Sequence, residues 1–224
     1  VGGSLRDSLL GMQPKDIDIA SSASPTEIKL IFNSYKTIDT GIDFGTVTLI
    51  YNDKSVEITT FRSESVYLDS RRPDSVSFEK NIDEDLKRRD FTINAMAYNQ
   101  SKKLVDLFSG EEDLNNKLIR CVGSPDERFS EDALRMLRAV RFACVLNFDI
   151  EKKTFEAIKY NASRIEHISK ERIQAELNKI LMSSKPSRGI RLLLDSKLLD
   201  YILPEISRLS GFDQHNPFHH LELL

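Results

Sequence analysis

The sequence contains no long apolar run and almost no cysteine. In 224 residues, 40% of them hydrophobic, no stretch approaches the roughly 20 apolar residues that a membrane-spanning helix needs. No secretory leader precedes Gly2, so we expect a cytoplasmic protein with no membrane partner. The two cysteines, Cys121 and Cys144, lie in sequence typical of ordinary strand and helix, which favours buried, reduced thiols over a disulfide or a metal pair.

An overall excess of positive charge is also missing. The net charge is -3, which is unusual for a protein that binds nucleic acid. Between residues 151 and 191, however, ten Lys and Arg stand against five Glu and no Asp, which leaves -8 on the remainder. An acidic half beside a basic helical half would suit metal chemistry on a polyanion, although a solvated helical surface gives the same count.

The first third of the chain mixes strand patterns with helical patterns. Strand patterns occupy residues 16–20, 47–51 and 56–61, and helical patterns occupy residues 4–10 and 25–32. The last two strands flank a turn at Asn52 and Asp53 and predict a hairpin, while Ser24 is expected to cap the second helix. In the first strand, Ile17 and Ile19 are expected to face a core.

Beyond residue 83 the apolar spacing becomes helical. Helical patterns cover residues 93–98, 134–146, 173–182 and 190–199, after a polar stretch at residues 62–80 that predicts a mobile loop. The sequence therefore predicts an α+β fold, with an N-terminal α+β domain to about residue 118 and an all-helical region after it. Because the chain starts directly at Val1 and stops within helix-like sequence, we expect a fragment.

Two acidic residues on one predicted strand form a candidate metal site. Asp16 and Asp18 are two positions apart, so both side chains leave the same face of the strand. Carboxylates this close repel each other unless a cation lies between them, and Mg²⁺ takes one or two carboxylates together with phosphate oxygens. Glu57, on the polar face of its own strand, is a third candidate. A pair of exposed strand acids remains the alternative for this pattern alone.

A glycine turn just upstream favours the metal interpretation. Gly2 and Gly3 form a turn just before the predicted helix at residues 4–10, where backbone N–H groups and the helix dipole attract a phosphate. Arg6 offers a guanidinium fork for phosphate oxygens. A phosphate cradle this close to paired carboxylates is a stronger signal than either feature alone.

Five sequence blocks follow one another along the chain in an order that resembles a known family. They are residues 2–7 (GGSLRD) with 15–18 (KDID), residues 88–95 (RRDFTINA), residues 106–110 (DLFSG) with Asp113, residues 131–138 (EDALRMLR) and residues 172–177 (RIQAEL). In this order they resemble the class II tRNA nucleotidyltransferase/poly(A) polymerase family of the DNA polymerase β superfamily. The resemblance implies a polymerase-β-like head of mixed sheet and helices at residues 1–118. A helical neck (119–165), an RNA-binding helical body (166–208) and the start of an HD-like region (209–224) would follow.

The resemblance also implies a role for each block. Asp16, Asp18 and Glu57 would be catalytic, with metal on the two aspartates, and Gly2, Gly3 and Arg6 would hold phosphates. Arg89 and Asp90 would recognise the ribose 2′-OH, with Asn94 as a further candidate, and Asp90 is also expected to cap a helix through Ala95. The third block resembles a hinge between head and neck.

The fourth block would select the nucleobase. Asp132 and Arg135 are expected on one face of a helix capped by Ser130, where an acid beside an arginine matches the donors and acceptors of a base edge. Glu131 and Arg138 would orient this pair. The last block would buttress the same helix.

The resemblance implies a template-independent enzyme that adds CCA to tRNA lacking its 3′ CCA, using CTP, ATP and Mg²⁺ and releasing pyrophosphate. A loop at residues 67–74 that looks complete favours full CCA addition. A bacterial poly(A) polymerase and a truncated, non-catalytic RNA- or nucleotide-binding module are the alternatives. Residues 211–220 resemble the entry to an HD hydrolase domain, and we expect their histidines to bind no metal. The sequence does not indicate an oligomeric state.

Overall fold

The computed structural model describes residues 1–14, 16–52, 54–64 and 76–211. They form an α+β protein, as predicted, and the chain divides into two units. The first unit contains residues 1–116 and 120–123, and the second contains residues 117–119 and the chain from residue 124 onward. The predicted division of the second unit into neck and body stays a prediction. Within the described ranges, no helix has the length and apolar character that a membrane crossing requires.

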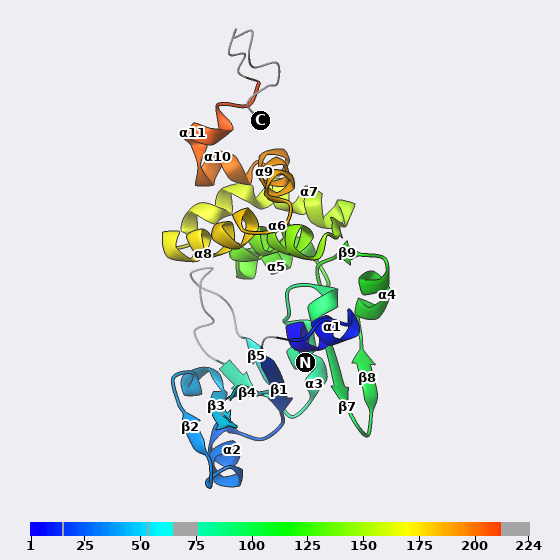
Figure 1. Cartoon of the computed structure of the whole chain (residues 1–224), viewed down its shortest axis with the longest axis vertical. Coiled ribbons are helices and arrows are strands. Elements are labelled where there is room, and N and C mark those ends of the chain that lie inside the picture. The colour runs from blue at the N-terminus through cyan, green and yellow to red at the C-terminus, as the bar shows by residue number, and fades with distance from the viewer. Residues whose placement is uncertain (15, 53, 65–75, 212–224) are drawn as a thin grey trace. The chain divides into compact units, whose positions relative to one another are not determined.

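A four-stranded mixed sheet organises the first unit (Figure 1). The strands are β1 (Ile17–Ser21), β2 (Lys36–Ile38), β3 (Thr46–Tyr51) and β4 (Lys54–Thr60). Their order is β1-β4-β3-β2, with β1 parallel to β4 and the other neighbours antiparallel. The predicted hairpin is confirmed as the β3–β4 pair, and β1 lies at one edge of the sheet.

Helix α2 (Pro25–Ile31) covers one face of this sheet. Ser24 caps it as predicted, in a reciprocal arrangement with Glu27 that satisfies two backbone N–H groups. The core beneath it consists of side chains that are at most 6% exposed: Ile28, Val47, Leu49 and Ile58. Burial of these apolar side chains is the main force that holds the helix on the sheet.

The prediction that Ile17 and Ile19 face a core is wrong. The register places Ile19 beside Ile58, on the face that α2 covers. Yet Ile17 is 52% exposed and Ile19 43% exposed. Because β1 is the edge strand and α2 packs against β3 and β4, the apolar side of β1 is left open among the described residues.

Short elements complete the first unit. They are α1 (Gly2–Leu9), η1 (Ile42–Phe44), β5 (Arg62–Glu64), β6 (Val76–Phe78), α3 (Ile82–Lys87), η2 (Thr92–Asn94), β7 (Met96–Asn99), β8 (Lys103–Asp106) and α4 (Gly110–Asn115). Strands β5 and β6 pair with each other at the two ends of the predicted mobile loop. The prediction of a loop over residues 62–80 is therefore wrong at these two strands, and residues 65–75, which include 67–74, lie outside the described residues.

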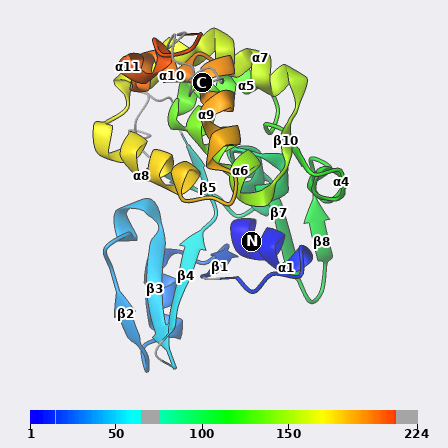
Figure 2. The same ribbon diagram turned by 45° about the horizontal axis from the view of Figure 1, so that its top comes forward.

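The helical pattern at residues 93–98 is a wrong prediction. Residues 92–94 form the short 3-10 helix η2, and β7 then pairs with β8 in an antiparallel hairpin (Figure 2). In so short a window, apolar residues fit both the helical and the strand period. Hydrogen bonding to β8, which the pattern did not include, decides the outcome.

The second unit is helical, as predicted. Its helices are α5 (Pro125–Glu131), α6 (Leu134–Leu146), α7 (Lys152–Asn161), η3 (Ala162–His167), α8 (Lys170–Leu181), α9 (Pro186–Asp195), α10 (Leu198–Ile202) and α11 (Pro204–Ser207). A short parallel pair joins β9 (Leu118–Ile119) to β10 (Asp149–Ile150). The pattern at 134–146 coincides with α6, whereas the pattern at 190–199 is interrupted at Lys197, where φ is +62°. Both cysteines are free and buried, as expected.

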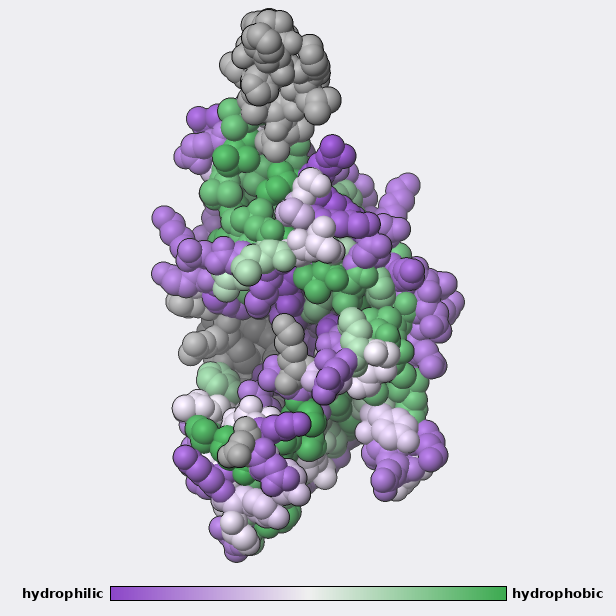
Figure 3. Space-filling view, in the orientation of Figure 1, coloured by the Kyte–Doolittle hydropathy of each residue, from purple (hydrophilic) through white to green (hydrophobic). Residues whose placement is uncertain are grey.

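Apolar side chains reach the surface near the end of the described chain. A hydrophobic area lies over α10 and α11 in Figure 3, where Tyr201, Ile206 and Leu209 are 41%, 36% and 37% exposed. The histidines predicted at the entry to an HD-like region lie beyond Gly211, outside the described residues.

Candidate nucleotidyltransferase site

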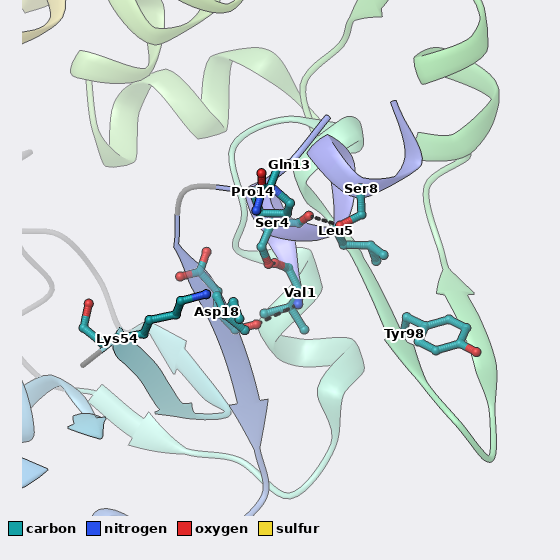
Figure 4. Close-up of a pocket in the computed structure, with 11 residues that line it drawn as sticks. Val1, Ser4, Leu5, Ser8, Gln13, Pro14, Asp18, Lys54 and Tyr98 are labelled. Carbon is teal, nitrogen blue, oxygen red and sulfur yellow. Dashed lines mark hydrogen bonds between the residues drawn. The ribbon is translucent and has the colours of Figure 1, made fainter. Parts of the chain in front are cut away.

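Helix α1 begins with the two predicted glycines. Gly2 has a φ of +63°, and a Cβ at this position would lie 2.5 Å from Nη1 of Arg89, so the site requires glycine. The backbone nitrogen of Val1 donates to the carbonyl of Asp18 at 2.9 Å (Figure 4). The glycine turn therefore lies between the strand that carries the paired carboxylates and the predicted ribose-reading block.

The candidate metal ligands lie on and just before β1. Asp18 is half-buried, Asp16 is exposed, and the register pairs Asp18 with Glu57 of β4 on the same face. None of these carboxylates has a hydrogen-bond or ion-pair partner among the described residues. In the same ranges, no three His, Cys, Asp or Glu side chains come close enough together to hold a metal ion. The metal-binding role of these carboxylates stays a prediction.

A buried network joins the first two sequence blocks. Asn94, which is 6% exposed, accepts a hydrogen bond from Nη1 of Arg6 at 2.6 Å. Its amide nitrogen donates to Oδ1 of Asp90 at 3.1 Å, and the same oxygen accepts the backbone N–H of Phe91 at 2.8 Å. Arg6 and Asp90 are each 8% exposed. Residues far apart in the sequence therefore fix one another through three polar side chains.

This network corrects two expectations. Asp90 does not cap a helix through Ala95, because η2 has no side-chain cap and Asp90 bonds to its own neighbour's N–H. Arg6 does not present an open fork, because its Nε and Nη2 also donate to Asp7 at 2.8 and 2.6 Å. Its guanidinium is buried between Asp7 and Asn94, which is the arrangement of a residue that supports its neighbours.

Asp85 of α3 is a buried acid that the sequence analysis missed. It is 1% exposed, its Oδ1 accepts from Arg88 at 2.7 Å, and its Oδ2 accepts from Arg89 at 3.0 Å. Burial opposes ionisation of this carboxyl, but the two guanidinium groups outweigh burial and hold its pKa below the usual value. An acid three and four residues before paired arginines, beside buried Leu86, is the signal that could have revealed it.

The third block packs against the second. Oδ1 of Asp106 accepts the backbone N–H of Gly110 at 2.8 Å and so satisfies the start of α4. A Cβ at Gly110 would lie 2.3 Å from the carbonyl oxygen of Thr92, so only glycine allows this approach. Asp113, which is 3% exposed, accepts from the hydroxyl of Thr92 and from Nε of Arg120. The predicted hinge role of these residues stays a prediction.

The base-reading block is not one continuous helix. Helix α5 ends at Glu131, Asp132 has an extended backbone, and α6 begins at Leu134. Ser130 therefore lies inside α5, and Asp132 does not share a helical face with Arg135. Oδ1 of Asp132 accepts the backbone N–H of Leu134 at 3.1 Å, which stabilises the start of α6.

Helix α8 forms one ion pair with this junction and a second with the middle of α6, and the buttress role that the resemblance implied stays a prediction. Nη2 of Arg172 donates to Oδ2 of Asp132 at 2.8 Å. Between α6 and α8, Nε of Arg141 lies 2.7 Å from Oε2 of Glu176. The carboxylate of Asp132 is thereby held in one orientation, with its side chain 19% exposed.

Arg135 is held by an acid, as the resemblance implied for Glu131. The Arg135 guanidinium pairs with Glu131, which also pairs with Arg128 at 2.5 Å. The Arg135 side chain is 10% exposed. Arg138 lies one turn farther along α6, with its guanidinium carbon 5.5 Å from the ring centre of Phe142. The selection of the base by Asp132 and Arg135 stays a prediction.

A cavity of about 760 Å³ lies beside the start of β1 (Figure 4). Its walls come from α1, β1, β4 and β7, and include Ser4, Ser8, Asp18, Lys54 and Tyr98. The cavity borders Asp18 but does not include the buried network of Arg6, Asp90 and Asn94. Of the three predicted acids, Asp18 lines the cavity, whereas Asp16 and Glu57 do not.

Comparison with known proteins places these features in a family. The model of the poly A polymerase head domain matches residues 1–120. The chain belongs to this nucleotidyltransferase family. A second model, described as a probable RNA and SrmB-binding site of polymerase A, matches residues 147–209.

The chain is similar to CCA-adding enzymes over nearly all of its length. It is 54% identical over 201 residues to the CCA-adding enzyme of Ligilactobacillus salivarius, covering 90% of this chain and 49% of that protein. The solved Bacillus stearothermophilus CCA-adding enzyme in complex with CTP is 41% identical with a TM-score of 0.85, covering 93% and 51%. The Thermotoga maritima CCA-adding enzyme complexed with tRNA is 29% identical with a TM-score of 0.77, covering 96% and 49%. The chain thus spans about half the length of these relatives.

Proposed function

We propose that the chain forms the nucleotide-binding and catalytic part of an enzyme that adds CCA to tRNA 3′ ends from CTP and ATP. The observation that carries this proposal is the likeness, over 93% of the chain, to a CCA-adding enzyme solved with CTP. The reaction is attack by the tRNA 3′-hydroxyl on the α-phosphate of the nucleotide, with pyrophosphate as the leaving group. Positioning and neutralisation of charge are the main contributions that a protein makes to such a transfer.

Asp16 and Asp18 are proposed to hold Mg²⁺. Asp18 lies on β1 and Asp16 directly before it, and neither carboxylate has a partner among the described residues, so the donor set suits a hard cation. When bound, the ion neutralises phosphate charge and lowers the pKa of the attacking hydroxyl. Glu57, paired in register with Asp18 on the neighbouring strand β4, is proposed as a further catalytic acid.

The start of α1 and the ribose-reading block are proposed to hold the sugar and phosphates. Gly2 and Gly3 form the first turn of α1, which has no side-chain cap, and N–H groups in a first turn have no partner within the helix and can bind phosphate oxygens. Arg89 donates to the ribose 2′-oxygen and Asp90 accepts from its proton, which distinguishes ribonucleotides from deoxyribonucleotides. Because the Arg6 guanidinium is buried against Asp7 and Asn94, we assign Arg6 and Asn94 to holding Asp90 in place.

Asp132 and Arg135 are proposed to select the base, with Glu131 and Arg138 orienting them. Each carboxylate oxygen of Asp132 makes one hydrogen bond to the described residues, and a carboxylate oxygen can accept two. An amino group of cytosine or adenine can therefore be recognised without breaking the contact to Arg172. The basic residues between Lys152 and Arg191, which lie in the segment matched by the RNA-binding model, are proposed to contact the tRNA backbone.

A poly(A) polymerase is the second candidate, because the matching family model is named for that activity. The names of the similar proteins favour CCA addition. Incorporation of CTP and ATP, separately and together, on tRNA lacking CCA distinguishes the two in the full-length protein. Sequenced products ending in CCA support the proposal, and an A tract contradicts it. A tRNA that already ends in CCA is the matched control and should not be extended.

A further inference from the structure

Arg89 is held more rigidly than ribose recognition alone would explain. Its Nε and Nη2 donate to Oδ2 of Asp85 at 3.3 and 3.0 Å, and its Nη1 donates to the carbonyl of Asn94 at 3.3 Å. A Cβ at Gly2 would lie 2.5 Å from this Nη1, so the glycine leaves the space that the guanidinium occupies. All three nitrogens of the Arg89 guanidinium therefore donate a hydrogen bond, which fixes the orientation of its plane.

We propose that Asp85 is a positioning residue that aims Arg89 at the ribose of the incoming nucleotide and so sets discrimination against 2′-deoxynucleotides. The inference rests on the proposed function of Arg89 and deepens it. A guanidinium carries five N–H groups, of which the three bonds above use three. The two that remain, one on each terminal nitrogen, have no partner among the described residues, and the Arg89 side chain is 20% exposed. These two groups are the ones that a substrate oxygen can reach.

A second arginine, Arg88, keeps the buried carboxylate of Asp85 charged and correctly oriented. Arg88 donates to Oδ1 of Asp85 through Nε and Nη2, at 3.1 and 2.7 Å, so each carboxylate oxygen serves one guanidinium. Burial raises the pKa of the Asp85 carboxyl, but the two guanidinium groups lower it by more, so Asp85 stays ionised. A carboxylate whose two oxygens each accept hydrogen bonds from a guanidinium has one orientation, and Asp85 therefore fixes the orientation of Arg89.

A purely structural role is the competing explanation, because removing one partner of a buried ion pair destabilises a protein whatever its function. Stability and discrimination must therefore be measured separately. The readout is the ratio of the dissociation constants of dCTP and CTP, measured by calorimetry in Mg²⁺ buffer without tRNA on the full-length protein. This ratio is measured without catalysis, so it tests the role of Asp85 independently of the proposed activity. The proposed activity is contradicted by a different result, namely that the wild-type protein extends no tRNA.

Asp85→Asn keeps the shape of the side chain and removes its charge. We expect the dCTP/CTP ratio to fall roughly 10-fold, as one charge-assisted contact to the ribose loses its orientation. Asp83→Asn is the matched control, because it is the same substitution on the same helix and Asp83 has no arginine partner among the described residues. An unchanged ratio in Asp85→Asn, or an equal fall in Asp83→Asn, overturns the proposal.

Asp85→Glu decides the question where Asp85→Asn does not fold. It retains the charge that Arg88 and Arg89 require but moves the carboxylate by one methylene. We expect this variant to fold and its ratio to fall about threefold or more, because Arg89 is displaced. A folded Asp85→Glu protein with the wild-type ratio contradicts the positioning role.

Discussion

Gly2→Ala tests the close approach between the start of α1 and the ribose-reading block. An alanine in the left-handed region costs about 1–2 kcal/mol. Its Cβ would also lie 2.5 Å from Nη1 of Arg89, so the guanidinium must move and its 3.3 Å bond to the Asn94 carbonyl is lost. That bond adds about 0.5–1.5 kcal/mol. We expect the first unit to lose about 2–3 kcal/mol of stability.

Gly3→Ala is the matched control one residue away. A Cβ at Gly3 would meet nothing nearer than 3.6 Å, and Gly3 does not have positive φ. Alanine in a helix is favoured over glycine by about 0.5–1 kcal/mol, so this variant should be neutral or more stable. The stability of both variants is measured by urea unfolding of the full-length protein, with hydrogen exchange of first-unit peptides as the signal. Variants within about 0.5 kcal/mol of each other would refute the reasoning.

Three further predictions concern packing and charge. Gly110→Ala places a Cβ 2.3 Å from the Thr92 carbonyl, and we expect a loss of about 1–3 kcal/mol in urea unfolding. Ile58→Ala, at 4% exposure, should cost about 2–5 kcal/mol, whereas Leu30→Ala, at 71% exposure, should change stability by less than about 0.5 kcal/mol. The pKa of Asp85 is lowered in the folded state, so its contribution is complete above the unfolded value of about 3.9 and is lost as pH falls through the folded value. The stability gap between wild type and Asp85→Asn should therefore narrow in acid titrations below about pH 4, and a constant gap would contradict this assignment.

Local signals predicted the sheet and its covering helix well. The pattern of apolar residues around Asn52 predicted β3 and β4, and Ser24 predicted the start of α2. The same kind of pattern misplaced Ile17 and Ile19, because their exposure depends on what covers the edge strand rather than on the strand itself. Burial is set by tertiary packing, which a period of two does not encode.

The candidate site was predicted as a set of residues but not as a network. Sequence blocks identified Arg6, Asp90 and Asn94 one by one, and their hydrogen bonds to each other depend on long-range folding. The break before α6 could have been predicted, because Asp132 directly precedes an apolar helical run and is a favoured N-terminal capping residue. Asp85 was missed because an acid near two arginines is usually part of a solvated helix surface.

The central claim concerns Asp18 on β1 and Asp16 directly before it, the proposed metal ligands. The most direct test is Mg²⁺-dependent addition of CTP and ATP to tRNA lacking CCA by the full-length protein carrying Asp16→Asn and Asp18→Asn. The account predicts that incorporation falls by about a thousandfold or more while tRNA binding is unchanged, because the variant loses the proposed metal ligands and keeps the basic second unit. Incorporation within about tenfold of wild type would contradict it.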